Sequence, residues 1–275
     1  MKPSVRAGVR RKAAGAEELR SFLDRKVAEY NRPSFIDEDP IGIPHQYSKS
    51  QDIEISAFFT AIFSWGNRTT IIRKSDELMQ LMDRAPYDFV LHHTDNHLKR
   101  LLNFRHRTFN PTDLLYFIAF LRHHYSHYDS LEDAFLRPWE GRAPATGDWE
   151  AERALAAFYH YFFSLDTVPP RTRKHIASPE KNSSCKRINM FLRWMVRQDN
   201  KGVDFGLWRR IGPDRLICPL DLHVARVAKK FKLLTRPSSD WLAALELTEN
   251  LQAFDPRDPV KYDFALFGLG AIEKF

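Results

Sequence analysis

The segment from Ser50 to Trp65 constrains the fold more than any other part of the sequence. Its residues are apolar on nearly every face of the helix that their spacing predicts, although Glu54 and Ser56 interrupt the run. A helix that is apolar on most faces is normally buried at the centre of its fold, so we expect this helix there. The run is shorter than the roughly 18 apolar residues that span a bilayer, so the sequence does not predict a membrane protein.

Apolar residues recur at helical spacing through most of the remaining chain, whereas no stretch alternates as a strand does. The other predicted helices cover residues 17–30, 69–82, 86–92, 95–102, 111–125, 130–136, 149–164, 184–198, 222–231, 239–252 and 259–273. With 43% hydrophobic and 28% charged residues, the 275-residue chain has the composition of an ordinary globular protein. We therefore predict an all-α fold.

Cysteine usage and the N-terminal sequence indicate a compartment. Cys185 and Cys218 are too few for a disulfide scaffold or a four-thiolate cluster, and free thiols fit a reducing environment. The basic start Met1–Lys12 is followed by no apolar signal-peptide core. The sequence therefore predicts a cytoplasmic protein.

The net charge of +7 is distributed unevenly along the chain. Residues 1–26 hold eight Lys or Arg against three acidic residues, and residues 1–16 lack an apolar stripe. We expect residues 1–16 to form a flexible basic tail. Residues 171–201 hold nine Lys or Arg against two acidic residues. This second stretch either covers a solvated helix face or binds a polyanion such as a nucleic-acid backbone.

Small polar residues favour nucleic-acid binding by the second stretch. Ser183 and Ser184 stand just before a predicted helix start, where backbone N–H groups and the helix dipole can hold a phosphate. We expect these residues to contact the backbone: Arg171, Arg173, Lys174, Lys181, Ser183, Ser184 and Arg187. The predicted partner is double-stranded DNA, with structured RNA as an alternative.

Two residues at predicted helix starts carry the candidate chemistry. Lys186 opens the motif Lys186–Asn189 (Lys-Arg-Ile-Asn), and Asp221 lies within Pro219–Val224 (Pro-Leu-Asp-Leu-His-Val), 35 residues after the lysine. An Asp just ahead of a helix is most often only an N-cap. Its pairing with a lysine at a second helix start favours a catalytic role for both residues.

These two elements resemble those of the helix-hairpin-helix DNA glycosylase/lyase (HhH-GPD) superfamily. The wide spacing and the tryptophan-bearing segment between them are closest to its archaeal-type 8-oxoguanine DNA glycosylase branch. From about Tyr30 to Phe275, the chain is also similar to a bacterial family of conserved proteins without an assigned function. The resemblance implies one two-lobed helical domain over residues 17–275, with one lobe formed by 17–50 and 222–275 and the other by 51–221.

The resemblance also implies an activity, the excision of a damaged base, with an oxidised purine as the favoured lesion. Lys186 would attack C1′ of the deoxyribose and form a Schiff base, which permits strand cleavage. Asp221 would stabilise the positive charge that develops on the sugar, or deprotonate the nucleophile. The chemistry requires neither a metal nor an organic cofactor, and we expect a monomer.

Further residues fit such a site. Asn67 or Arg68 could fill the gap that a flipped base leaves, although Trp65–Arg68 also fits an ordinary helix break. Trp194, Trp208 and His223 are candidates for a base pocket, with core packing as the alternative.

The sequence also fits two alternative functions. The segment Ser178–Cys185 contains no glycine where the superfamily has a glycine hairpin, which favours a non-catalytic nucleic-acid-binding module on the same fold. His123 and His127 share a helix face at i and i+4, which suits a metal-dependent hydrolase.

Overall fold

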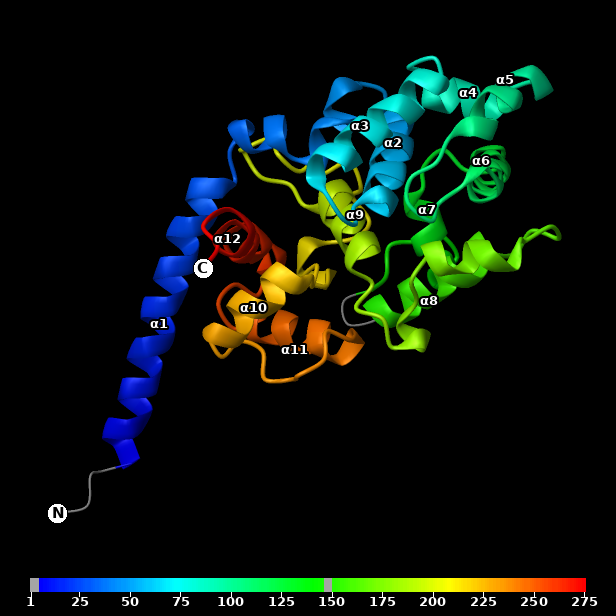
Figure 1. Cartoon of the computed structure of the whole chain (residues 1–275). Coiled ribbons are helices and arrows are strands. Elements are labelled where there is room, and N and C mark those ends of the chain that lie inside the picture. Colours follow the sequence, from blue (N-terminus) through cyan, green and yellow to red (C-terminus); the bar gives the residue numbers. More distant parts are fainter. Residues whose placement is uncertain (1–4, 146–149) are drawn as a thin grey trace.

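The computed structural model describes residues 5–145 and 150–275, with side chains from Gly15 onward. Twelve α-helices form the described fold: α1 Val5–Tyr30, α2 Ser50–Phe63, α3 Arg68–Leu81, α4 Pro86–His92, α5 Asp95–Arg100, α6 Pro111–Tyr125, α7 Glu132–Phe135, α8 Ala151–Phe162, α9 Lys186–Val196, α10 Leu222–Lys230, α11 Trp241–Gln252 and α12 Tyr262–Phe267 (Figure 1). Since the described residues form no strand, the all-α prediction is confirmed.

Short 3-10 helices connect these elements, and a π-helix follows α12. The 3-10 helices are η1 Pro33–Glu38, η2 Pro40–Gly42, η3 Pro44–Gln46, η4 Leu101–Asn103, η5 Arg137–Trp139, η6 Pro170–His175, η7 Pro179–Lys181, η8 Pro213–Arg215 and η9 Pro259–Lys261. The π-helix η10 covers Gly268–Ile272. None of the described helices combines the length and apolar character that crossing a membrane requires.

Helix α2 lies at the centre of the fold, as its sequence predicts. Every residue from Ile53 to Phe63 is buried, and the helix packs against α9, α3 and α4. The Phe58 ring lies 5.5 Å from that of Phe191 on α9 and 5.8 Å from that of Phe117 on α6. α2 therefore joins the helices that follow it to the helix that begins with Lys186.

The polar interruption of α2 at Glu54 is a buried hydrogen-bonding centre. Its carboxylate accepts hydrogen bonds from Tyr125 Oη, Ser130 Oγ, the Leu131 amide and Trp208 Nε1. Burial raises the pKa of Glu54, and the donors oppose that rise because they favour the ionised form. Glu54 thus connects α2 to the end of α6, the start of α7 and the segment after α9.

The two ends of the chain meet. α1 packs along α12, and α10 packs against both α12 and η10 (Figure 1). Two glycines permit this close packing: a Cβ on Gly268 would lie 2.2 Å from Tyr30 Cδ2, and one on Gly270 would lie 2.8 Å from the His223 carbonyl oxygen. The predicted lobe of residues 17–50 and 222–275 stays a prediction, and within it η2 and η3 pack against α2, which belongs to the other predicted lobe.

Two predicted elements have different boundaries in the structure. α1 begins at Val5 rather than at residue 17, so residues 5–16 of the predicted tail are helical, while residues 1–4 lie outside the described residues. The flexibility of this segment stays a prediction. The single helix predicted over 259–273 is divided into η9, α12 and η10.

Candidate active site

The segment between η7 and α9 turns sharply although it contains no glycine. Asn182 (φ 53°) and Cys185 (φ 52°) both adopt the left-handed conformation that glycine usually supplies. The Ser183 hydroxyl accepts a hydrogen bond from the Cys185 amide at 3.2 Å, which supports the second of these turns. The missing glycines therefore do not prevent the chain from turning sharply into α9.

Cys185 immediately precedes Lys186 but has the properties of a structural residue. Its side chain is fully buried, and burial raises the pKa of the thiol to about 12. Because the thiolate is the nucleophilic form of cysteine, this thiol is unreactive at neutral pH. Lys186 is consequently the stronger nucleophile candidate at this end of α9.

The first turn of α9 is anchored on the last carbonyl groups of α2. Lys186 Nζ lies 3.4 Å from the Ser64 carbonyl oxygen. Arg187 donates to the carbonyl oxygens of Ile62 (2.6 Å) and His175 (3.2 Å), and burial lowers its pKa to about 10. Cations are favourable at the negative end of a helix dipole. Arg187 therefore anchors the start of α9 on main-chain carbonyl groups, and its predicted contact with a phosphate stays a prediction.

The break between α2 and α3 lies beside Lys186, because Ser64 is the C-cap of α2. Asn67 is exposed and caps α3, with its side-chain oxygen accepting from the Thr70 amide at 3.0 Å. The Arg68 guanidinium lies over the Phe267 ring of α12, 5.4 Å from its centroid. The structure thus locates the segment predicted to fill a base gap next to the predicted nucleophile.

Asp221 is the N-cap of α10, and the start of this helix adjoins the start of α9. Its Oδ1 accepts from the Val224 amide at 2.9 Å. Two residues before Lys186, the Ser184 hydroxyl donates to the Leu220 carbonyl oxygen at 3.3 Å. This contact joins the segments that carry the two predicted catalytic residues, although Lys186 and Asp221 form no direct ion pair in the described part of the chain.

A buried carboxylate on α12, Asp263, lies within electrostatic range of both predicted catalytic residues. Burial raises the pKa of Asp263 to about 6, against the charge of its partner Arg193; the Asp221 charge raises it further and Lys186 lowers it. Asp39, the N-cap of η2, also has a pKa raised by burial, and the charge of Lys186 opposes that rise. Neither carboxylate stands out in the sequence, because each has the pattern of an ordinary acid at a helix start.

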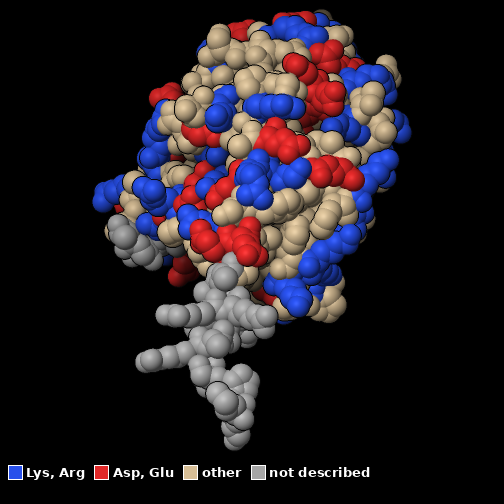
Figure 2. Space-filling model, turned by 90° about the vertical axis from the view of Figure 1, so that its left-hand side faces the viewer, with Lys and Arg blue, Asp and Glu red and all other residues tan. Residues whose placement is uncertain are grey.

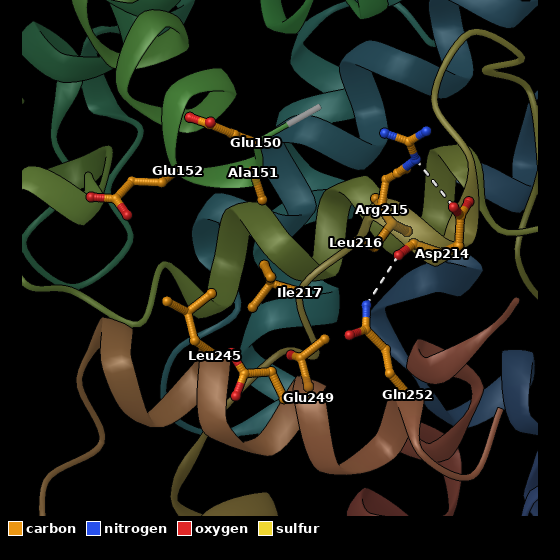
Figure 3. Close-up of a pocket in the computed structure, with 11 residues that line it drawn as sticks. Glu150, Ala151, Glu152, Asp214, Arg215, Leu216, Ile217, Leu245, Glu249 and Gln252 are labelled. Carbon is orange, nitrogen blue, oxygen red and sulfur yellow. Dashed lines mark hydrogen bonds and ion pairs between the residues drawn. The ribbon is translucent and has the colours of Figure 1, made fainter. Parts of the chain in front are cut away.

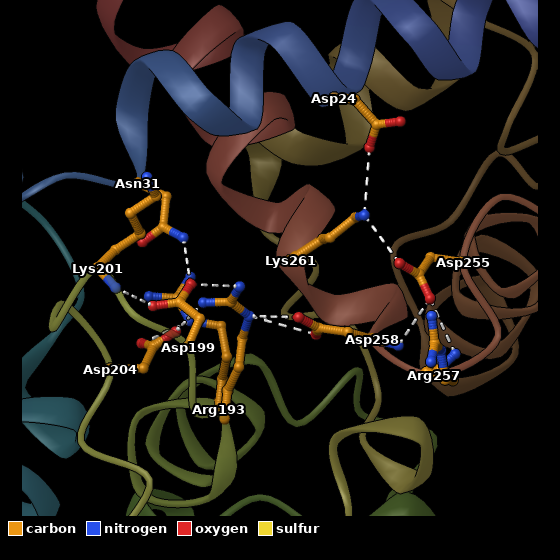
Figure 4. Close-up of polar contacts among 11 residues, drawn as sticks. Asp24, Asn31, Arg193, Asp199, Lys201, Asp204, Asp255, Arg257, Asp258 and Lys261 are labelled. Atoms are coloured by element: carbon orange, nitrogen blue, oxygen red, sulfur yellow. Dashed lines mark hydrogen bonds and ion pairs between the residues drawn. The ribbon is translucent and has the colours of Figure 1, made fainter.

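Arg193 and Arg197 belong to a buried ion-pair network rather than to a basic surface (Figure 4). Arg193 donates to Asp204 at 3.3 Å and to Asp263. Arg197 binds three carboxylates, Asp204 at 3.1 Å, Asp199 at 2.8 Å and Asp258 at 2.9 Å. Two of the nine positive charges in the stretch 171–201 are thus neutralised inside the protein.

The remaining predicted phosphate contacts are divided between buried and exposed positions. Arg171 is held by the buried Asp113 (2.6 Å) and the Thr108 carbonyl (2.9 Å), so its charge is compensated. Arg173, Lys174 and Lys181 are exposed. Ser183 forms a backbone bridge with Asp240, and Ser184 binds Leu220 as described. Only the three exposed cations keep a surface position that suits a phosphate.

The two tryptophans predicted to line a base pocket lie in the hydrophobic core instead. Trp194 and Trp208 are 1% and 2% exposed and lie in the hydrophobic core, where the Trp208 indole donates to Glu54 at 2.6 Å. Neither ring offers a face to a base in this conformation, which corrects that expectation. His223 is partly buried against Gly270, close to Asp221 in the chain.

His123 lies in the last turn of α6, whereas His127 follows the end of that helix, so the two do not share a helix face as predicted. His127 Nδ1 lies 2.8 Å from the His123 carbonyl oxygen, and the two rings are 5.0 Å apart. In the described ranges, no group of three or more His, Cys, Asp or Glu side chains is arranged to hold a metal ion. The structure therefore adds no ligand to the pair on which the hydrolase alternative depends.

Surface charge is mixed on one face of the molecule. On the face that Figure 2 shows, Lys and Arg are interspersed with Asp and Glu. A separate groove is acidic: Glu150, Glu152 and Glu249 surround an apolar floor that includes Leu216 and Leu245 (Figure 3). Because phosphates would be repelled there, this groove does not suit a nucleic-acid backbone.

Fold and site together define an all-helical protein in which a lysine and an aspartate begin two adjoining helices, beside the break between α2 and α3. The chain belongs to the family described as "Protein of unknown function (DUF2400)", which matches residues 39–272 and thus Lys186, Asp221 and the α2–α3 break. Comparison with curated proteins finds no match. Comparison with solved structures finds none either.

Proposed function

We propose that the protein is a DNA base-excision glycosylase with associated lyase activity, and that an oxidised purine is its substrate. The observation that carries this proposal is the contact between Ser184 and Leu220, which joins the starts of the helices bearing Lys186 and Asp221. The α2–α3 break adds a polar segment, Asn67 and Arg68, which begins three residues after the Ser64 carbonyl that Lys186 contacts. The HhH-GPD resemblance supplies the reaction class.

In the proposed reaction, the lone pair of Lys186 Nζ forms a bond to C1′ of the damaged nucleotide. The C1′–N bond to the base breaks, and the base leaves with the bonding electrons and takes up a proton. The Asp221 carboxylate stabilises the positive charge that develops on the sugar. Opening of the sugar gives a Schiff base, from which loss of a C2′ proton expels the 3′ phosphate and cleaves the strand.

Borohydride trapping tests this proposal, because hydride reduces the Schiff base to a stable amine between protein and DNA. We would incubate the full-length protein with duplexes that each contain one lesion, including oxidised purines. We expect a covalent adduct with one class of lesion, and its loss in Lys186→Ala. Lys201→Ala removes an exposed lysine of the same stretch outside the site, and this control should retain the adduct.

The result also separates the proposal from its alternative. If duplexes bind in a salt-sensitive manner but neither adduct nor base release is seen with any lesion, the protein is a non-catalytic nucleic-acid-binding module. If Lys186→Ala retains the adduct, a different amine forms it, and the assignment of Lys186 is wrong.

A further inference from the structure

One large apolar side chain is exposed at the edge of the candidate active site. Leu222, the first residue of α10, is 78% exposed and directly follows Asp221. It is the most exposed large hydrophobic residue among the described side chains. Its position rather than its exposure alone makes it informative, since isolated exposed leucines are common on protein surfaces.

Helix α10 is strongly amphipathic, and Leu222 lies on its polar face. The buried face consists of Val224, Ala225, Val227 and Ala228. The exposed face carries Arg226, Lys229 and Lys230, which share one side of the helix with Leu222 at offsets of four, seven and eight residues. A single leucine therefore ends a basic face next to Asp221.

The cations on this face have no carboxylate partner among the described side chains. Arg226 donates to the Gly270 carbonyl at 2.6 Å, and Lys229 donates to the Pro237 carbonyl at 2.7 Å. The Lys230 ammonium lies 4.6 Å from the centroid of the Phe275 ring. Carbonyl groups and rings orient these side chains without neutralising them, so the face retains its positive charge and complements a polyanion.

We propose that the exposed face of α10 lies along a DNA backbone and that Leu222 inserts between bases beside the nucleotide held at Asp221. Apolar side chains that enter a duplex in this way partly unstack a base step. Here such an insertion would help to hold open the site of a flipped nucleotide. This inference rests on the proposed function, because it assumes that the site binds DNA.

Helix α11 supplies a matched control within the same protein. Its Leu242 is 50% exposed and also lies in the first turn after an Asp N-cap, Asp240. The accessible polar side of α11 carries Glu246 and Glu249 instead of cations. Leu242→Ala thus removes an equivalent exposed leucine from a face that would repel phosphate.

The test uses a duplex with 2-aminopurine next to a tetrahydrofuran abasic analogue, so that fluorescence intensity reports unstacking and anisotropy reports binding. We expect Leu222→Ala to bind the duplex about tenfold more weakly, because the substitution removes the apolar contact between the leucine and the bases. We also expect it to suppress the fluorescence increase. Leu242→Ala should match the wild type in both readouts. Circular dichroism of the variants checks that helical content is unchanged.

A second variant tests the phosphate contact separately. Lys229→Gln/Lys230→Gln should lower the slope of log affinity against log salt by about two, one for each lost phosphate contact. If the wild type binds DNA while Leu222→Ala and Leu242→Ala behave alike, the insertion is wrong and the proposed function stands. If the wild type binds no DNA at all, the proposed function fails and this inference fails with it.

Discussion

Helices α10 and α11 begin with the same cap in different surroundings. Asp221 accepts from the amide three residues onward at 2.9 Å, and Asp240 does the same at 2.9 Å. Asp240 is also paired with Arg236 at 3.1 Å, and this bond lowers its pKa. Asp221 has no ion-pair partner within the described ranges and lies in the electrostatic field shared by Asp263 and Lys186.

The difference teaches that a helix cap and a candidate catalytic residue can share one local geometry. In α11 the second carboxylate oxygen is occupied by an arginine one turn earlier, so Asp240 is fully explained by stability. In α10 the second oxygen of Asp221 accepts no hydrogen bond from the described residues and stays available to a substrate. The surroundings, not the cap, distinguish the two aspartates.

The largest expected difference between these helices is in base release. We compare Asp221→Asn with Asp240→Asn, because asparagine caps a helix as well as aspartate and both variants should fold. Asp221→Asn removes the charge beside the reacting sugar and should slow release by about 10²–10⁴-fold, whereas Asp240→Asn should leave the rate unchanged. Single-turnover release from the lesion duplex that traps wild-type protein measures this. Equal rates for the two variants would show that Asp221 is only a cap.

The second, smaller effect is on the free energy of unfolding, and here we expect the two aspartates to behave alike. Asp221→Ala removes the cap of α10 and should lower the free energy of unfolding by about 1 kcal/mol. Asp240→Ala should be destabilising in the same direction, because it loses an equivalent bond. Urea denaturation of both variants checks this. A stability of Asp221→Ala equal to that of the wild type would mean that the bond to Val224 does not contribute.

The third comparison concerns the pKa of Asp263, on which the Asp221 charge is one of several influences. The folded value of about 6 lies above the ordinary value near 3.9, so the folded state binds this proton more tightly than the unfolded state does. The resulting stability is present below about pH 4 and is lost as the pH rises through 6, by about 3 kcal/mol in total.

Because the Asp221 charge is one cause of the raised pKa, Asp221→Asn should lower the pKa of Asp263. Asp240→Asn should leave it unchanged, since Asp240 is not among the charges that shift it. Titration of the Asp263 carboxyl carbon by NMR measures the change. Identical titration curves in wild type and Asp221→Asn would place Asp221 too far from Asp263 to interact.

The sequence predicts the fold well where periodicity dominates. The apolar run of α2 correctly predicts a central buried helix, because little else can bury so many large side chains. Periodicity does not show why Glu54 is tolerated there, since its four donors come from three distant segments. Periodicity also does not predict the division of the last helix. There, Gly268 and Gly270 lie so close to Tyr30 and His223 that a side chain would not fit.

The site is predictable only in part, because charge counts do not show which charges are neutralised. Arg193 and Arg197 raise the apparent charge of their stretch, but their partners Asp204, Asp258 and Asp263 are up to 70 residues away in the sequence. Similarly, a left-handed conformation at Cys185 has no sequence signal, as cysteine rarely adopts it. The predicted helix starts at Lys186 and Asp221 are confirmed, because a helix start depends on neighbouring residues in the sequence.

The attachment of α9 to α2 has a consequence for how the proposed nucleophile moves. With Arg187 bound to the carbonyls of Ile62 and His175, the main chain at Lys186 is fixed relative to the break between α2 and α3. The amine can then move only by rotation about the bonds of its own four-carbon side chain. In the proposed reaction the sugar must travel to the amine rather than the reverse. A nucleotide that pairs and stacks well stays beyond the reach of the amine. In the proposed reaction, damaged nucleotides are therefore distinguished by the lower free energy that their unstacking and unpairing require, before any bond is broken.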